Sequence, residues 1–247
     1  MTVLITGATG LVGERLLPKL VKAGFACRVL LRDGKRRPEG TEAVTGDILD
    51  PSTLTSAVQG ASAIVHLAAV FRTKDTDLIW KSNLDGTRNL ISAVKAHAPD
   101  ARFIMSSTSH VYNKNNPHPG KEVDPVAPQS AYPASKVCAE RELGQSGLNW
   151  SILRFPFVYG DGDGHLESLT QHVGNWHPAQ RMSTIHHRDI AQAVTLALKG
   201  AFNRHIVNLA DDVPSSIYEL AGLVGCRLAQ NSEPLPNPWY LHVDTSL

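Results

Sequence analysis

Tyr132 and Lys136 stand four residues apart in the segment SAYPASKVCAE, residues 130–140. On a helix, side chains at this spacing share one face, so the lysine ammonium can lie beside the phenol. A free tyrosine has a pKa of about 10, and a neighbouring positive charge favours its phenolate form. Lowering that pKa by about three units takes roughly 4 kcal/mol, and one ammonium in a partly buried site could supply much of it. The pair could therefore move a proton on or off an oxygen near neutral pH.

An ordinary surface contact is the alternative for this pair, because i,i+4 contacts contribute only a few tenths of a kcal/mol to a helix. The spacing by itself does not separate the two interpretations. The catalytic interpretation of the pair is supported by a glycine-rich turn near the start of the chain.

The turn GATGLVG places Gly7, Gly10 and Gly13 between a buried strand expected at 2–6 and an amphipathic helix expected at 11–24. Such glycines permit the turn, let backbone N–H groups approach a pyrophosphate, and allow the helix to pack closely on the sheet. A glycine-rich turn without a ligand is the alternative. The position between strand and helix favours dinucleotide binding.

Arg32 stands at the end of the second expected strand, where an acidic residue would hold the ribose 2′-OH of NAD. An arginine fork matches a phosphate group, so Arg32 favours a 2′-phosphate and therefore NADP over NAD. A solvated loop with Asp33 on the ribose is the alternative. Asp47, in TGDI, is placed to accept a hydrogen bond from the adenine amine, or it is a plain turn aspartate.

The elements that would position these residues alternate along the chain. Short β-branched and apolar runs predict strands at 2–6, 27–32, 42–48, 62–69, 101–108, 150–155 and 204–210. Segments of helical period predict helices at 11–24, 51–60, 76–97, 132–143, 186–200 and 215–225. Strands that are apolar on both faces and alternate with helices indicate a parallel sheet covered on both sides. The last third of the chain is expected to form a small cap that does not fold independently.

The composition, 42% hydrophobic and 19% charged, is that of an ordinary globular protein with a large core. A net charge of +1 gives no electrostatic reason to expect nucleic acid or a membrane as a partner. The three cysteines form neither a disulfide framework nor a zinc motif. No signal-like start and no membrane-spanning apolar run is present, so we expect a cytoplasmic protein. His186 and His187 have no further ligand at metal spacing apart from Asp189, and no metal is expected.

The motifs GATGLVG, GDILD, IVHLAA, NLDGTRNL, SSTSHVY, YPASK, LRFPFVYG and IHHRD follow one another in this order. Together they resemble the extended branch of the short-chain dehydrogenase/reductase superfamily, the NAD-dependent epimerase/dehydratase family, from residue 1 to about 210. The resemblance implies an α/β fold: a Rossmann-type doubly wound parallel sheet over 1–160, with contributions from 180–210, and a small C-terminal substrate-binding cap over 161–247.

The resemblance also implies roles for individual residues. In that family a hydroxyl residue three positions before the valine of the SSTSHVY segment polarises the substrate oxygen, which implies Thr108, with Ser107 as the nearby alternative. Tyr132 and Lys136 match the catalytic pair. His110 could line the substrate pocket with these hydroxyl residues. The residues expected along the cofactor are Gly7, Thr9, Gly10, Leu11, Val12, Gly13, Arg32, Asp47, Ile48, Leu67, Ala68, Ala69, Asn83, Tyr132, Lys136, Phe155 and Val158.

Three departures from the family's pattern bear on function. Phe155 separates the arginine of LRFPFVYG from Pro156, where the family usually has proline directly after the arginine, so this cofactor contact stays open. The stretch between Tyr159 and His186 is short compared with sugar-nucleotide epimerases, which favours a smaller substrate. The chain also ends at VDTSL, where relatives usually continue, so we expect a truncated or unusual tail.

The sequence thus predicts an NAD(P)-dependent oxidoreductase that transfers hydride between nicotinamide and a small carbonyl or hydroxyl compound, sugar-like compounds included. A nucleotide-sugar epimerase or dehydratase that recycles its NAD internally is the alternative on the same fold. A non-catalytic NADP-sensing protein is a third, and the Tyr132–Lys136 pair counts against it. The family implies a homodimer through the 76–97 helix and the helix that carries Tyr132.

Overall fold

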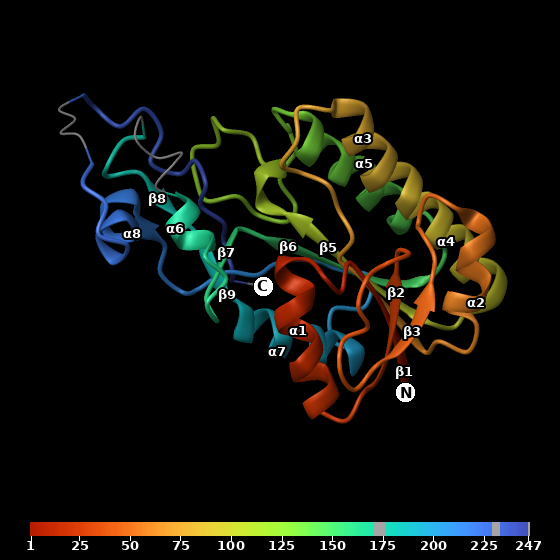
Figure 1. The fold of residues 1–247 in the computed structure, drawn as a ribbon. Coiled ribbons are helices and arrows are strands. Elements are labelled where there is room, and N and C mark those ends of the chain that lie inside the picture. Colours follow the sequence, from red (N-terminus) through yellow and green to blue (C-terminus); the bar gives the residue numbers. More distant parts are fainter. Residues whose placement is uncertain (170–175, 229–232, 247) are drawn as a thin grey trace.

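The computed structural model describes residues 1–169, 176–228 and 233–246 (Figure 1). Within these ranges one sheet has the strand order β10-β6-β5-β4-β1-β2-β3, and all neighbouring strands run parallel. The expected doubly wound parallel sheet is thereby confirmed. Its strands are β1 (Thr2–Thr6), β2 (Ala26–Leu31), β3 (Glu42–Thr45), β4 (Ala63–His66), β5 (Arg102–Thr108), β6 (Asn149–Phe155) and β10 (Ile206–Asn208).

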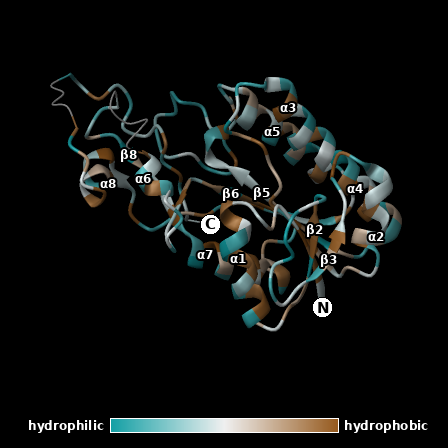
Figure 2. Ribbon diagram, viewed as in Figure 1, coloured by the Kyte–Doolittle hydropathy of each residue, from teal (hydrophilic) through white to brown (hydrophobic). Residues whose placement is uncertain are grey.

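Helices cover both faces of this sheet and enclose two separate cores. In β1, Val3 and Ile5 pack toward α1 and α7, whereas Leu4 packs toward α2 and α4. Each successive strand residue is therefore buried on one side or the other, which is why these strands are continuous apolar runs. Figure 2 shows the hydrophobic residues along the strands between the helical layers. The covering helices are α1 (Leu11–Lys22), α2 (Leu54–Val58), α4 (Gly86–His97), α5 (Ala131–Gly144) and α7 (His187–Leu198).

Three predicted elements differ from the structure in ways that matter for the site. The helix expected at 76–97 is helical throughout, but α3 (Thr76–Trp80) joins α4 through a π-helical turn, η2 (Lys81–Asp85). The strand expected at 62–69 ends at His66, and the next residues leave the sheet to line the cleft described below. The helix expected at 51–60 begins as a 3₁₀ turn, η1 (Pro51–Thr53).

Smaller elements lie beyond one end of the sheet. β7 (Phe157–Tyr159) pairs with β9 (Thr184–His186), and β8 (Arg181–Met182) pairs with β11 (Ser215–Ser216). Together with α6 (His165–Leu169) and α8 (Ile217–Leu223) they surround a small core of Leu169, Met182, Ile217 and Leu220.

Two elements from the same third of the chain join the main sheet instead. α7 packs in the core beneath α1, and β10 extends the sheet beside β6. The division of the chain at residue 160 into two parts stays a prediction. Within the described residues, no helix combines the length and the apolar character needed to cross a membrane.

Candidate active site

A cleft opens at the carboxyl ends of the parallel strands, where the strand order reverses between β1 and β4. Two adjoining pockets of about 420 Å³ each form this cleft. The β2-side pocket extends from the glycine turn to the ends of β2 and β3, and the β5-side pocket extends to the ends of β5 and β6. Gly7, Gly10, Leu67 and Ala69 line both pockets, so the cleft is continuous.

The glycine turn forms the floor shared by the two pockets. Gly7 has φ +72°, and a Cβ there would lie 2.6 Å from the backbone nitrogen of Ala68. A Cβ on Gly13 would collide with the carbonyl oxygen of Gly7. Gly10 is the N-cap of α1 and offers no side chain to the first turn, so the N–H groups at the start of this helix are left for a ligand in the cleft.

Most of the residues predicted to form the site line this cleft. Asn83 and Lys136 are the two that do not. The predicted residues that line the β2-side pocket are Gly7, Thr9, Gly10, Arg32, Asp47, Ile48, Leu67, Ala68 and Ala69. Those that line the β5-side pocket include Leu11, Val12, Gly13, Ser107, Thr108, His110, Tyr132, Phe155 and Val158.

Thr108 and Tyr132 come together at the wall of the β5-side pocket. Thr108 is the last residue of β5, Tyr132 lies in the first turn of α5, and both side chains line this pocket. Lys136 follows one turn later on α5 and is 1% exposed. Ser107 is also buried, and its hydroxyl lines the pocket without a hydrogen-bond partner among the described residues.

The charges of this group differ from the prediction. Burial raises the pKa of Tyr132 to about 12, and the hydrogen bond with Thr108 lowers this pKa only in part. Burial also lowers the pKa of Lys136 to about 8, against the opposing effect of the Glu140 carboxylate. The expectation that the lysine charge brings the tyrosine toward phenolate is therefore wrong for this structure, because the loss of hydration penalises both charged forms. A pKa of about 12 keeps Tyr132 in its neutral phenol form near pH 7.

Asn83 holds two walls of the cleft in place. Its side chain is fully buried in the π-helical turn η2, accepts a hydrogen bond from the Val70 N–H at 2.8 Å and donates to the Val70 carbonyl at 2.9 Å. It also donates to Ser135 Oγ at 3.1 Å, between Tyr132 and Lys136 on α5. The geometry does not support the predicted contact between Asn83 and a cofactor, because the side-chain amide of Asn83 forms its hydrogen bonds with protein atoms.

His66, to which the sequence analysis assigned no role, connects the same elements beneath the cleft. Its Nδ1 is 2.6 Å from Thr6 Oγ1, and its Nε2 is 2.9 Å from Thr87 Oγ1. Thr87 donates its hydroxyl hydrogen to the Asn83 carbonyl at 2.7 Å, so Nε2 carries the histidine proton and Nδ1 accepts from Thr6. Burial, with a smaller effect of the Lys136 charge, lowers the pKa of His66 to about 3. His66 is thus a neutral link between β1, β4 and α4.

The far end of the β2-side pocket holds the residues predicted to distinguish NADP from NAD. Arg32 and Lys35 line it and are exposed, and within the described residues neither forms an ion pair. Asp47 Oδ1 accepts the Leu49 N–H at 2.9 Å, which fixes its own turn. Asp33 accepts the N–H of Gly34 at 2.9 Å and does not line the pocket. Arg32 and Lys35 are therefore the basic side chains that line this end of the cleft.

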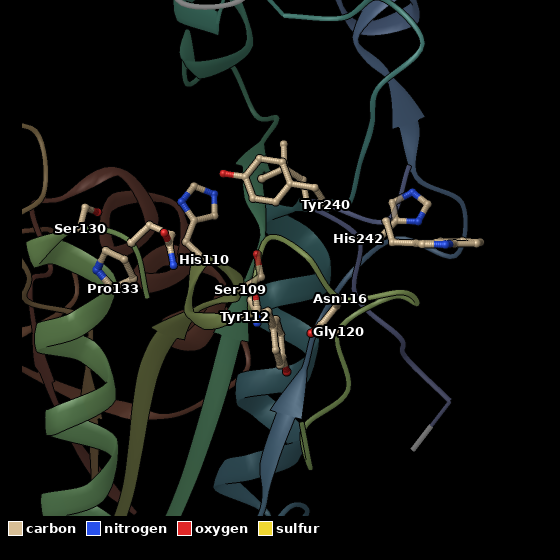
Figure 3. A pocket seen from close by; sticks show the side chains of 13 residues that line it. Ser109, His110, Tyr112, Asn116, Gly120, Ser130, Pro133, Tyr240 and His242 are labelled. Atoms are coloured by element: carbon tan, nitrogen blue, oxygen red, sulfur yellow. The ribbon is translucent and has the colours of Figure 1, made fainter. Parts of the chain in front are cut away.

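A smaller polar recess of about 80 Å³ adjoins the β5-side pocket, and His110 lines both. Figure 3 shows His110 between the start of α5, at Ser130 and Pro133, and Tyr240 of the C-terminal segment. That segment is fastened to the loop after β5, since Gly120 donates its N–H to the His242 carbonyl and accepts from the Asp244 N–H, both at 2.9 Å. The last part of the chain thus closes this side of the site.

The paired histidines form no metal centre in the described parts of the chain, where no three His, Cys, Asp or Glu side chains gather as ligands. His186 caps α7 by accepting the Arg188 N–H at 3.1 Å. His187 pairs with Asp163 at 2.8 Å, and both side chains are buried.

Two curated relatives and one solved structure illustrate what the chain is similar to. Ceramide reductase of Caulobacter vibrioides is 31% identical over 173 residues, which cover 68% of this chain and 50% of the reductase. The 2-alkyl-3-oxoalkanoate reductase of Stenotrophomonas maltophilia is 30% identical over 178 residues, which cover 67% of this chain and 53% of that protein. The chain thus spans about half the length of these two relatives. The UDP-glucose 4-epimerase of Thermus thermophilus, solved in complex with NAD, is 26% identical with a TM-score of 0.78, and the match covers 96% of this chain and 88% of that one.

A sequence profile extends the likeness over most of the chain. The profile of the NAD dependent epimerase/dehydratase family matches residues 3–210. This range contains the glycine turn, the ends of the sheet strands that form the cleft, and the Thr108–Tyr132–Lys136 group. The family resemblance of the motifs is confirmed: the chain belongs to the NAD-dependent epimerase/dehydratase family and is an enzyme of that family.

Proposed function

We propose that the protein is an NADP-dependent oxidoreductase that reduces a small carbonyl compound, or oxidises the corresponding alcohol, in the β5-side pocket. The observation that carries the proposal is that Thr108 and Tyr132 line the same pocket of a cleft that starts at the glycine turn. The nicotinamide of the bound cofactor supplies or accepts the hydride. The two reductases among the relatives support the reductive direction.

The side chains of the protein perform the other parts of the proposed reaction. Tyr132, neutral because burial raises its pKa to about 12, donates its proton to the carbonyl oxygen of the substrate. Thr108 and the unpartnered hydroxyl of Ser107 orient that oxygen by hydrogen bonding. Lys136 lies one turn away on α5, and its charge favours the phenolate that Tyr132 becomes after donating.

The cofactor half of the proposal depends on Arg32 and Lys35. The NAD of the solved epimerase supports a dinucleotide in the cleft. The basic side chains of the β2-side pocket fit an additional 2′-phosphate, since a guanidinium can donate two parallel hydrogen bonds to it. Asn83 and Lys136 act from behind the cleft wall, through Val70, Ser135 and Tyr132.

Thermal-shift and equilibrium binding with NADP⁺ and NAD⁺ test the cofactor. We expect tighter binding of NADP⁺, and a loss of about tenfold or more in NADP⁺ affinity in R32Q with NAD⁺ affinity retained. R36Q is the matched control, because Arg36 is exposed on the same loop but does not line the pocket. Tighter binding of NAD⁺ to the wild-type protein would reject the assignment.

The reaction itself is tested with NADPH and a panel of carbonyl compounds, by following the absorbance of the reduced nicotinamide. An epimerase that recycles its cofactor is the second candidate, because the solved relative is a UDP-glucose 4-epimerase. UDP-glucose is therefore assayed separately with NAD⁺ or NADP⁺ and product analysis, because epimerisation begins with oxidation of the sugar by the oxidised cofactor. Conversion to UDP-galactose without net formation of reduced nicotinamide would favour the epimerase, whereas net oxidation of NADPH by a carbonyl compound supports the proposal.

A further inference from the structure

The outer walls of the β5-side pocket are apolar and aromatic. They come from the loop after β4, from β7, from α6 and from the segment that follows residue 175. The side chains that form them are Phe71, Phe157, Leu169 and Trp176. Such walls remove apolar surface of a ligand from water. They suit a substrate with a hydrophobic body beside its carbonyl group.

The polar residues of the same pocket are electrically neutral. Thr108, Ser107 and Tyr132 carry hydroxyl groups. His110 and His165 also line the pocket, and burial lowers the pKa of both imidazoles. These groups can orient a substrate by hydrogen bonding, but they do not select for its charge.

Arg72 is the exception. Among the described residues that line the β5-side pocket it alone carries a formal charge, and no carboxylate in the described part of the chain pairs with it. By contrast, Lys19 and Arg188, near the loop after β7, are both paired with Asp161, at 2.6 and 3.2 Å. An unpaired guanidinium at an apolar pocket is a recognition element for an anion.

The position of Arg72 brings this charge close to the reacting group. Its guanidinium carbon lies 5.1 Å from the centroid of the Phe71 ring, and that ring lies 5.6 Å from the ring of Tyr132. From the other side, the charge of Arg72 contributes to lowering the pKa of His165, whose ring stacks on Phe157. Arg72 is therefore an exposed cation at the pocket, next to Phe71 and close enough to His165 to act on its pKa.

From this placement we infer that the substrate of the proposed reaction carries a carboxylate on its hydrophobic body, and that Arg72 binds this carboxylate. A carboxylate fits better than a phosphate, because one guanidinium balances one negative charge and the other polar groups of the pocket are neutral. This inference rests on the proposed function, because it describes the substrate of that reaction. Its test is a binding measurement that requires no turnover.

The experiment compares 4-phenylbutanoate with its neutral isostere 4-phenylbutanamide by calorimetry on the NADP⁺-loaded protein. We expect the wild-type protein to bind the acid about tenfold tighter than the amide, which is the scale of one charge-assisted contact. R72Q should lose this preference while retaining its affinity for the amide, and R72K should keep part of it. K74Q is the matched control, because Lys74 is an exposed cation of the same loop that does not line the pocket.

Three results would overturn the inference. One is equal binding of acid and amide by the wild-type protein. Another is an equal loss of preference in K74Q, which would show a general effect of charge. The third is a loss of NADP⁺ affinity in R72Q with the acid preference intact, which would assign Arg72 to the cofactor. Y132F separates this test from the proposed function, because it should retain the acid preference whether or not Tyr132 is the proton donor.

Discussion

Glu140 and Arg154 form a bidentate ion pair inside the protein. Arg154 Nε lies 3.0 Å from Glu140 Oε1, and Nη2 lies 2.6 Å from Oε2, with side chains 3% and 5% exposed. Arg154 also donates to the Tyr112 hydroxyl at 3.0 Å. The pair fixes α5, one turn beyond Lys136, to β6 of the main sheet. The helix that carries Tyr132 and Lys136 is thus positioned by an ion pair between two residues to which the sequence analysis assigned no role.

Breaking this pair should be costly. R154M leaves the Glu140 carboxylate buried without a partner, so we expect the free energy of unfolding to fall by about 3–5 kcal/mol in urea denaturation. The double variant E140L/R154M should recover most of that loss, because no unpaired charge remains. R88M is the control, since the exposed Arg88–Glu142 pair also ends on α5 and should change stability by less than about 1 kcal/mol. A loss in R154M no larger than in R88M would contradict the argument.

The hydroxyls of Thr108 and Tyr132 should be needed for turnover but not for cofactor binding. On the carbonyl compound that the substrate panel identifies, we expect Y132F to lower kcat by about 10²–10⁴-fold. T108V should also lose activity, whereas T108S keeps a hydroxyl at the same place and should lose much less. Equilibrium binding of NADP⁺ to all three variants should match the wild type. Wild-type kcat in Y132F would rule out Tyr132 as the proton donor.

Burial of Lys136 should make the protein more stable at alkaline pH. The pKa of this lysine falls from 10.5 to about 8 on folding, so between these values the unfolded chain binds more protons than the folded one. Stability therefore rises with pH across this window, and the contribution is lost as pH falls through about 8. In urea unfolding, K136M should be more stable than the wild type near pH 7, by on the order of 3 kcal/mol, and this advantage should shrink toward pH 10.

The exposed Lys95 of α4 provides the comparison for that titration. K95M removes the same charge from the helical layer without relieving a buried ammonium, so its stability relative to the wild type should not vary with pH in this way. If K136M and K95M showed the same pH dependence, burial of Lys136 would not be the cause.

Asn83 should act as a positioning residue. N83D removes the two hydrogen bonds that the amide donates, to the Val70 carbonyl and to Ser135 Oγ. Because it also places a carboxylate in a fully buried position, we expect the free energy of unfolding to fall by about 1–3 kcal/mol or more. The KM for the substrate should rise as well, because these hydrogen bonds hold the walls of the cleft. The opposite pattern, unchanged stability with weakened NADP⁺ binding, would assign Asn83 to the cofactor directly.

Local signals in the sequence predicted the architecture well. TVLIT, the glycine turn and the following amphipathic helix are adjacent in the chain, and β1 and α1 form there. The i,i+4 spacing of Tyr132 and Lys136 likewise needed only short-range information, whereas Thr108, at the end of β5, was implied by the family resemblance. The loss of strand structure after His66 was missed, because the next residues are as apolar as a strand but are directed into the cleft.

Signals for the supporting residues were present but ambiguous. Glu140 lies four residues after Lys136, on the same helix face, yet nothing near it in the sequence indicates Arg154 as its partner. Asn83 stands in a segment of regular helical period, in which the π-helical turn gives no clear pattern. His66 and Arg72 flank the residues matched to the family loop, and their roles depend on side chains from β1, α4 and α6.

The sequence by itself determined the parallel sheet and the glycine turn, because periodicity and turn chemistry act between residues close together in the chain, while the family resemblance implied the group of Thr108, Tyr132 and Lys136. Only the tertiary structure decided the charge of that group. Burial by distant segments raises the pKa of Tyr132 and lowers that of Lys136, since removing water penalises an ionised group whatever its neighbour in the sequence.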